Sequence, residues 1–167
     1  LDFVFSFICN VNRDISMHIQ YDNLQGNDII ALLEEHLADM FATSPAESVH
    51  ALDLNALKAP DIHFFSARKD GKLLGCVAVK QHSDTEAELK SMRTTRAARG
   101  TGAGYALLLH AISFCREKGF TTLSLETGTQ PYFEAARKLY YRNGFKDCGP
   151  FASYQPDPNS HFMTLTL

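Results

Sequence analysis

A glycine-rich segment at positions 99–104, with the sequence RGTGAG, constrains the fold of this chain more than any other feature. It lies between a predicted strand at 86–94 and a long apolar helix predicted at 103–118. Glycines permit a tight turn and let the backbone approach a ligand closely. The helix that follows directs unpaired N–H groups and the positive end of its dipole at the loop. This order predicts a loop that can hold a diphosphate.

The same loop lacks the marks of two common phosphate-binding motifs. No Gly-Lys-Ser/Thr triplet follows its glycines, so it is not a nucleotide P-loop. Its G-x-G-x-G spacing differs from the G-x-G-x-x-G of dinucleotide-binding folds, and the flanking elements do not form a plain βαβ unit. A tight connection that binds nothing remains an alternative interpretation of the loop taken alone.

The periodicity of apolar residues predicts alternating elements along the rest of the chain. Strands are predicted at 18–21, 62–68, 73–81, 86–94, 121–126 and 161–167. Helices are predicted after a cap at Asn27, as one or two short helices within 43–60, at 103–118 and at 131–142. An antiparallel meander followed by strand, helix, strand, helix and strand indicates a mixed α/β domain.

Composition bounds the remaining possibilities. A chain of 167 residues with 45% hydrophobic positions predicts a single domain, which we assign to 17–167. Residues 1–16 show no clear periodicity. They are interpreted either as an upstream extension or as an added edge strand at 3–8. The net charge of −3 offers no basic face for nucleic acid, and the apolar stretch near the start is too short to span a membrane.

The four cysteines lie far apart and form no C-x-x-C pair, which predicts neither a metal site nor a disulfide framework. Free thiols fit a cytoplasmic location.

Two sequence blocks resemble the GCN5-related N-acetyltransferase (GNAT) superfamily. Arg99, Gly102 and Gly104 match its acyl-coenzyme A signature Q/R-x-x-G-x-G/A, and ARKLYYRNGF at 136–145 is similar to its A-x-x-L-Y-x-x-x-G-F block. The resemblance covers 17–167 and implies a central twisted, mostly antiparallel sheet, flanked by helices, with strands four and five splayed apart. It implies acetyl-CoA as cofactor, with the pantetheine arm in the gap and the pyrophosphate on the glycine loop.

The cofactor-binding residues implied by this resemblance are Met92, Arg93, Thr94, Arg99, Gly100, Thr101, Gly102, Ala103 and Gly104. Met92 and Thr94 would offer backbone groups, so the side chain of Arg93 is not needed. One departure is Phe133, which stands where the family often has an asparagine that bonds the pantetheine.

Transfer of an acetyl group to an amine needs a neutral nucleophile and a proton for the departing thiolate. Tyr140 matches the family tyrosine near the cofactor sulfur and is the predicted acid; packing of a helix tyrosine against the sheet is the alternative. Glu86 and Glu88 share one face of a strand and are candidate bases, with Glu88 preferred because it lies nearer the cofactor. A water chain is the alternative to a dedicated base.

Three residues are candidates for contact with the acceptor: Glu126, Lys90 and Tyr154. The predicted function is acetyl-CoA-dependent N-acetylation of a small-molecule amine, with the short helices within 43–60 as one wall of the acceptor pocket. A non-catalytic acyl-CoA-binding sensor and a protein N-acetyltransferase are the alternatives. Because many members of the family pair, a homodimer is also open.

Overall fold

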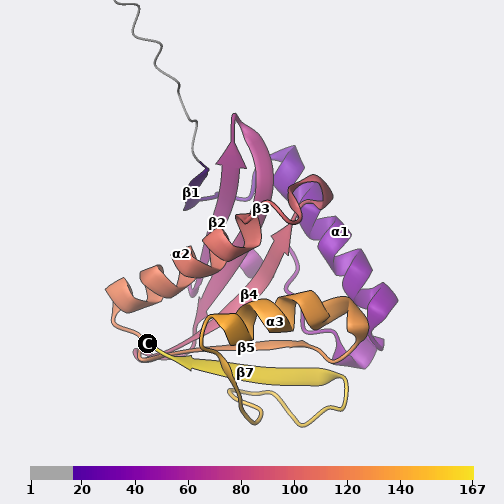
Figure 1. The fold of residues 1–167 in the computed structure, drawn as a ribbon, viewed down its shortest axis with the longest axis vertical. Helices are drawn as coiled ribbons and strands as arrows, with labels where there is room; N and C mark the ends of the chain where they lie inside the picture. The colour runs from indigo at the N-terminus through magenta and orange to yellow at the C-terminus, as the bar shows by residue number, and fades with distance from the viewer. Residues whose placement is uncertain (1–16) are drawn as a thin grey trace, which may run out of the picture.

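A seven-stranded sheet forms the centre of the computed structural model, which describes residues 17–167 (Figure 1). The strand order is β1-β2-β3-β4-β5-β7-β6, and every neighbouring pair is antiparallel except β4 with β5, which are parallel. The expected mixed, mostly antiparallel sheet is confirmed. The expectations for residues 1–16 lie outside the described residues.

The strands are β1 (His18–Tyr21), β2 (Ile62–Lys69), β3 (Lys72–Gln81), β4 (Glu86–Thr94), β5 (Thr122–Gly128), β6 (Lys146–Asp147) and β7 (Ser160–Thr166). The helices are α1 (Asn27–Thr43), α2 (Ala103–Lys118) and α3 (Glu134–Arg142), with short 3-10 turns η1 (Ala46–Ser48), η2 (Ala56–Lys58), η3 (Arg96–Ala98) and η4 (Pro131–Phe133). Asn27 is not the cap of α1, because Gly26 takes that position in extended backbone.

Helices cover both faces of the sheet, and the alternation of side chains along β3 decides which residues meet which helix. Val77 and Val79 face the larger core, together with apolar residues of α2 and α3. Cys76 and Ala78 face the opposite side and pack with α1 and η2. In Figure 1, α2 and α3 lie across the near face, while α1 runs along the right-hand side.

The sheet opens at its centre, where β4 and β5 diverge. Their pairing ends at Leu89 with Leu125, although β5 continues to pair with β7 as far as Gly128. Beyond Leu89, β4 has an irregular register against β3, and Ser91 has a left-handed φ of 49°. Such a bulge bends the strand away from its neighbour. The predicted splay of strands four and five is therefore confirmed, and it leaves a gap in the middle of the fold.

Candidate active site

Three cavities meet at this gap. A loop cavity of about 720 Å³ lies between the end of β4, residues 98–105 and η4–α3. A polar cavity, also about 720 Å³, lies between residues 47–52, β3–β4 and residues 152–159. A throat of about 100 Å³ separates β4 from β5, and it shares Tyr140 with the loop cavity and Lys90 with the polar cavity. The two large cavities therefore approach each other through the splayed strands.

The glycine loop has the backbone conformation that a diphosphate site needs. Gly100 and Gly102 have left-handed φ values of 75° and 90°, which residues with a Cβ rarely adopt. Gly102 is the N-cap of α2, and no side chain caps the helix. An added Cβ at either glycine would meet no atom within 4 Å, so the N–H end of α2 is open to a ligand.

Most of the predicted cofactor residues line the loop cavity. These are Met92, Arg93, Thr94, Arg99, Gly100, Gly102 and Gly104. Ala103 is buried within the first turn of α2, and the Thr101 hydroxyl donates to the Ala98 carbonyl at 2.5 Å. These two residues shape the loop from within.

Phe133 fills the place where an asparagine was expected. Its ring covers Gly128, where an added Cβ would lie 2.2 Å from the ring carbons. Phe133 is buried and lines both the loop cavity and the throat. The fit of a pantetheine arm at this position therefore depends on apolar contact and on backbone groups.

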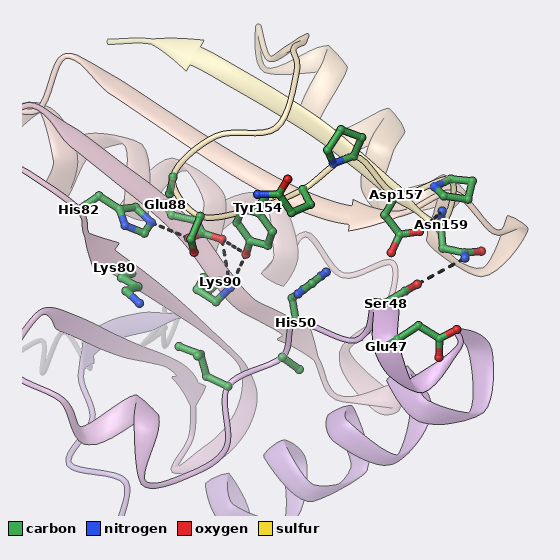
Figure 2. A pocket seen from close by; sticks show the side chains of 17 residues that line it. Glu47, Ser48, His50, Lys80, His82, Glu88, Lys90, Tyr154, Asp157 and Asn159 are labelled. Atoms are coloured by element: carbon green, nitrogen blue, oxygen red, sulfur yellow. Dashed lines mark hydrogen bonds and ion pairs between the residues drawn. The ribbon is translucent and has the colours of Figure 1, made fainter.

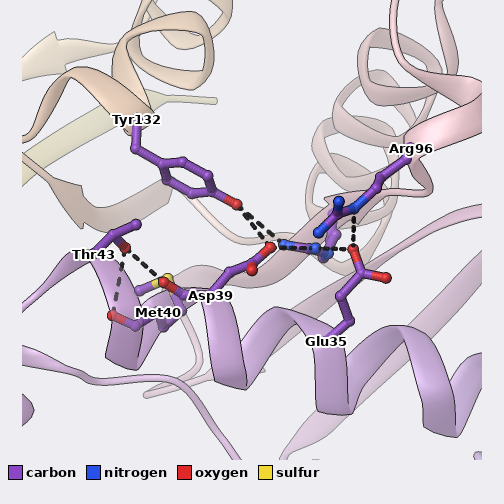
Figure 3. Close-up of polar contacts among 7 residues, drawn as sticks. Glu35, Asp39, Met40, Thr43, Arg96 and Tyr132 are labelled. Carbon is purple, nitrogen blue, oxygen red and sulfur yellow. Dashed lines mark hydrogen bonds and ion pairs between the residues drawn. The ribbon is translucent and has the colours of Figure 1, made fainter.

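The Arg93 side chain joins β4 to α1. Its guanidinium pairs with Glu35 and, at 2.6 Å, with Asp39, while its other terminal nitrogen donates to the Tyr132 hydroxyl at 3.3 Å. Tyr132 also donates to Asp39 at 3.1 Å, and Arg96 pairs with Glu35 (Figure 3). The arginine holds the pKa of Asp39 below its ordinary value. This network ties β4 and η4, on the two sides of the gap, to one helix.

Tyr140 lies where the loop cavity and the throat meet. It is 6% exposed, and burial raises the pKa of its phenol well above the ordinary value. The adjacent Tyr141 points outward, with its hydroxyl on Asp147. The helix therefore directs Tyr140, rather than its neighbour, at the gap, with the phenol held in its protonated form.

Two other residues that line the throat have strongly shifted pKa values. Burial raises the pKa of Glu126 to about 7, while the nearby charge of Lys90 acts in the opposite direction. Burial lowers the pKa of His36 to about 4, so this histidine is neutral at physiological pH. Glu126 is the carboxyl group here that changes charge near neutral pH.

Glu88 is the centre of a hydrogen-bonded cluster on one wall of the polar cavity (Figure 2). Its Oε1 accepts from Lys90 Nζ at 3.0 Å and from the Tyr154 hydroxyl at 2.5 Å, and its Oε2 lies 2.7 Å from His82 Nε2. The residue is 2% exposed. Since both oxygens are engaged by strong donors, Glu88 is poorly placed to accept a proton from an acceptor amine.

Glu86 does not reach the site. It is exposed at the start of β4, opposite Thr122, where β4 and β5 are still paired, and it lines none of the three cavities. The expectation that Glu86 reaches the mouth of the gap is wrong, because the gap opens only after Leu89. Alternation put Glu86 and Glu88 on one face correctly but carried no information on where the strands separate.

Sequence reasoning missed several polar residues of the polar cavity, among them His50, Lys80 and His82. Lys80 could have been found, because the turn around Asp84 pairs positions equally far on each side and places Lys80 opposite Glu88. His50 follows η1 and packs edge-on against Tyr154, far away in sequence. No local pattern marks such a contact.

Comparisons with known proteins agree with this geometry. The model of the acetyltransferase (GNAT) family matches residues 29–145. The uncharacterized N-acetyltransferase YsnE of Bacillus subtilis (strain 168) is 46% identical over 151 residues, covering 90% of this chain and 100% of that protein. The IAA acetyltransferase of Azospirillum brasilense is 42% identical over 143 residues, covering 83% of this chain and 88% of that protein.

Solved structures share the fold. A putative acyl-CoA N-acyltransferase from Klebsiella pneumoniae is 28% identical with a TM-score of 0.74, covering 92% of this chain and 99% of that one. The PaiA N-acetyltransferase of Thermoplasma acidophilum, solved in complex with coenzyme A, has a TM-score of 0.64 at 19% identity, covering 91% and 99%. In residues 17–167, no helix has the length and apolar character to cross a membrane.

Proposed function

Because the chain belongs to the GNAT family of acetyl-CoA-dependent N-acetyltransferases, we propose that it acetylates the amine of a small molecule bound in the polar cavity. The observation that carries this proposal is the throat, which joins a cavity beside the glycine loop to a second cavity with polar walls. Donor and acceptor would then approach the gap from opposite sides.

In the loop cavity, the first turn of α2 and the backbone of Gly100 and Gly102 would hold the diphosphate, and the unpaired edge of β4 would hold the pantetheine arm. Acetyl-CoA supplies the thioester carbonyl and the thiolate that leaves. A backbone N–H of β4 near Met92, at the bulge, is our candidate for binding the oxyanion.

Glu126 is our candidate base. Its carboxylate lines the throat, and its pKa of about 7 suits removal of a proton from an ammonium group near neutral pH. Glu126 would take one proton from the ammonium group before attack. As the neutral amine forms the new C–N bond and the C–S bond breaks, the second amine proton would end on the departing sulfur, so that coenzyme A leaves as the free thiol. The protonated phenol of Tyr140 would donate a hydrogen bond to the developing thiolate; full proton transfer is less favourable, because burial raises the phenol pKa.

The shape of the polar cavity favours a small acceptor over a protein. Its two walls are joined at one end, where Asn159 Nδ2 donates to Ser48 Oγ at 3.4 Å (Figure 2). Asp157 strengthens this closure by accepting from the Asn159 backbone at 2.8 Å. An extended peptide running through the cavity would have to break these contacts.

Release of free coenzyme A from acetyl-CoA, measured over a library of primary amines and of short peptides with free N-termini or lysines, tests the proposal. Turnover with small amines and not with peptides is expected. Turnover with peptides alone would refute it.

A matched pair of variants locates the acceptor. Ala51 lines both the polar cavity and the throat, so Ala51→Trp should block turnover while acetyl-CoA still binds in calorimetric titration. Ala38→Trp makes the same change on an exposed position of α1 and should leave both unchanged. Full turnover by Ala51→Trp would contradict the assignment of the polar cavity.

A further inference from the structure

The wall of the polar cavity built by β3 and β4 carries an excess of positive charge. Lys80 lies directly opposite Glu88 in the strand pairing, and Lys90 lies opposite Ala78, so both lysines point to the same face as Glu88. All three line the cavity. One carboxylate therefore faces two ammonium groups, before any charge on His82 is counted.

The contacts of this wall leave Lys80 as the available cation. Glu88 pairs with Lys90 at 3.0 Å and with His82 at 2.7 Å, and Lys90 also donates to Tyr154. Lys80 is half-buried and makes no ion pair with any residue in 17–167. The carboxylate opposite Lys80 is engaged by other donors, and a half-buried ammonium that makes no ion pair can bind an anionic group.

The acidic groups of the cavity lie elsewhere. Asp157 is hydrogen bonded to the Asn159 backbone, at the end where the loop meets η1, and Glu47 is exposed beside it (Figure 2). Glu126 lies in the throat. The positive wall and the proton-accepting carboxyl thus occupy different parts of one connected space.

We propose that the acceptor is an amine that also carries a carboxylate, an amino acid or a molecule like it, with the carboxylate on Lys80 and the amine directed into the throat. This rests on the proposed function and adds the chemical class of its substrate. The charges of such an acceptor are complementary to those of the site. Its carboxylate would contact the ammonium group of Lys80 on β3, and its own ammonium group would lose a proton to Glu126.

Matched substrates test the proposal. L-amino acids and ω-amino acids are compared with their own carboxamides by release of coenzyme A, since each amide keeps the amine and loses the negative charge. The amide amine is the weaker base and is more often neutral, so intrinsic reactivity works against the expected result. We expect kcat/KM for the best acids to exceed that of their amides roughly tenfold or more, the size of a charge-assisted hydrogen bond.

Variants assign this preference to Lys80. Lys80→Ala should bring the ratio of acid to amide close to one, and Lys80→Arg should keep most of it. Lys69→Ala, an exposed lysine at the β2–β3 turn, is the matched control and should leave the ratio unchanged.

The possible outcomes separate failure of the carboxylate site from failure of the proposed function. If amides serve as well as acids, or if Lys80→Ala keeps the preference, the carboxylate site is refuted while the proposed function stands. If acetyl-CoA binds but no small amine of either kind is acetylated, the proposed function fails, and the carboxylate site fails with it.

Discussion

Replacing Glu126 by glutamine should make the protein more stable and less active, and both effects should depend on pH. Burial raises the pKa of Glu126 from the ordinary 4.5 to about 7. Between these values the unfolded chain loses a proton that the folded chain retains, so folding stability falls as pH rises and the loss is complete above about pH 7. Glutamine has no such proton, and Glu126→Gln should gain about 2 to 3 kcal/mol relative to the wild type between pH 5 and pH 8.

The same substitution should lower the catalytic rate. If the ionised carboxylate accepts the amine proton, the active fraction of the wild type rises roughly tenfold between pH 6 and pH 8. Glu126→Gln should lower kcat/KM by about 100-fold or more at pH 8. Since ionisation of the amine itself affects both proteins, the ratio of wild type to variant isolates the contribution of Glu126.

Urea denaturation at pH 5 and pH 8 and a pH profile of coenzyme A release measure the two effects. Glu86→Gln is the control, because Glu86 is an exposed carboxylate on the neighbouring strand and lines no part of the site. A stability difference that does not change with pH would show that the pKa of Glu126 is not raised in the folded protein. An unchanged rate ratio would remove it as the base.

Three further changes have defined outcomes. Tyr140→Phe should lower kcat with little change in acetyl-CoA affinity measured by calorimetry, because only the hydroxyl is lost; unchanged kcat would remove Tyr140 from the reaction. Gly128→Ala should displace the Phe133 ring, destabilise the fold by about 1 to 3 kcal/mol in urea titration and weaken acetyl-CoA binding, whereas a neutral result would mean that the ring moves freely. Arg93→Met should destabilise the fold in the same titration, because the buried guanidinium no longer links β4 to Asp39 of α1; an unchanged urea midpoint would show that the network does not hold α1 in place.

Local patterns determined much of this molecule. The glycine loop, the bounds of α2 and the range of β4 were predicted as the structure has them, because glycine conformation, helical periodicity and strand alternation act over neighbouring residues. The same patterns carried the family resemblance and hence acetyl-CoA. β6 was missed, because a strand of two residues has no periodicity to read.

The tertiary structure alone decided the chemistry of the site. The polar cavity joins residues near positions 50, 80–90 and 155, and only folding brings these together. Glu88, Glu86 and Glu126 are equivalent carboxylates in the sequence. Folding engages the first with three donors, leaves the second in solvent and places the third, half-buried and with a raised pKa, at the gap. Desolvation and long-range pairing set these differences, and neither is encoded by the residues adjacent in the chain.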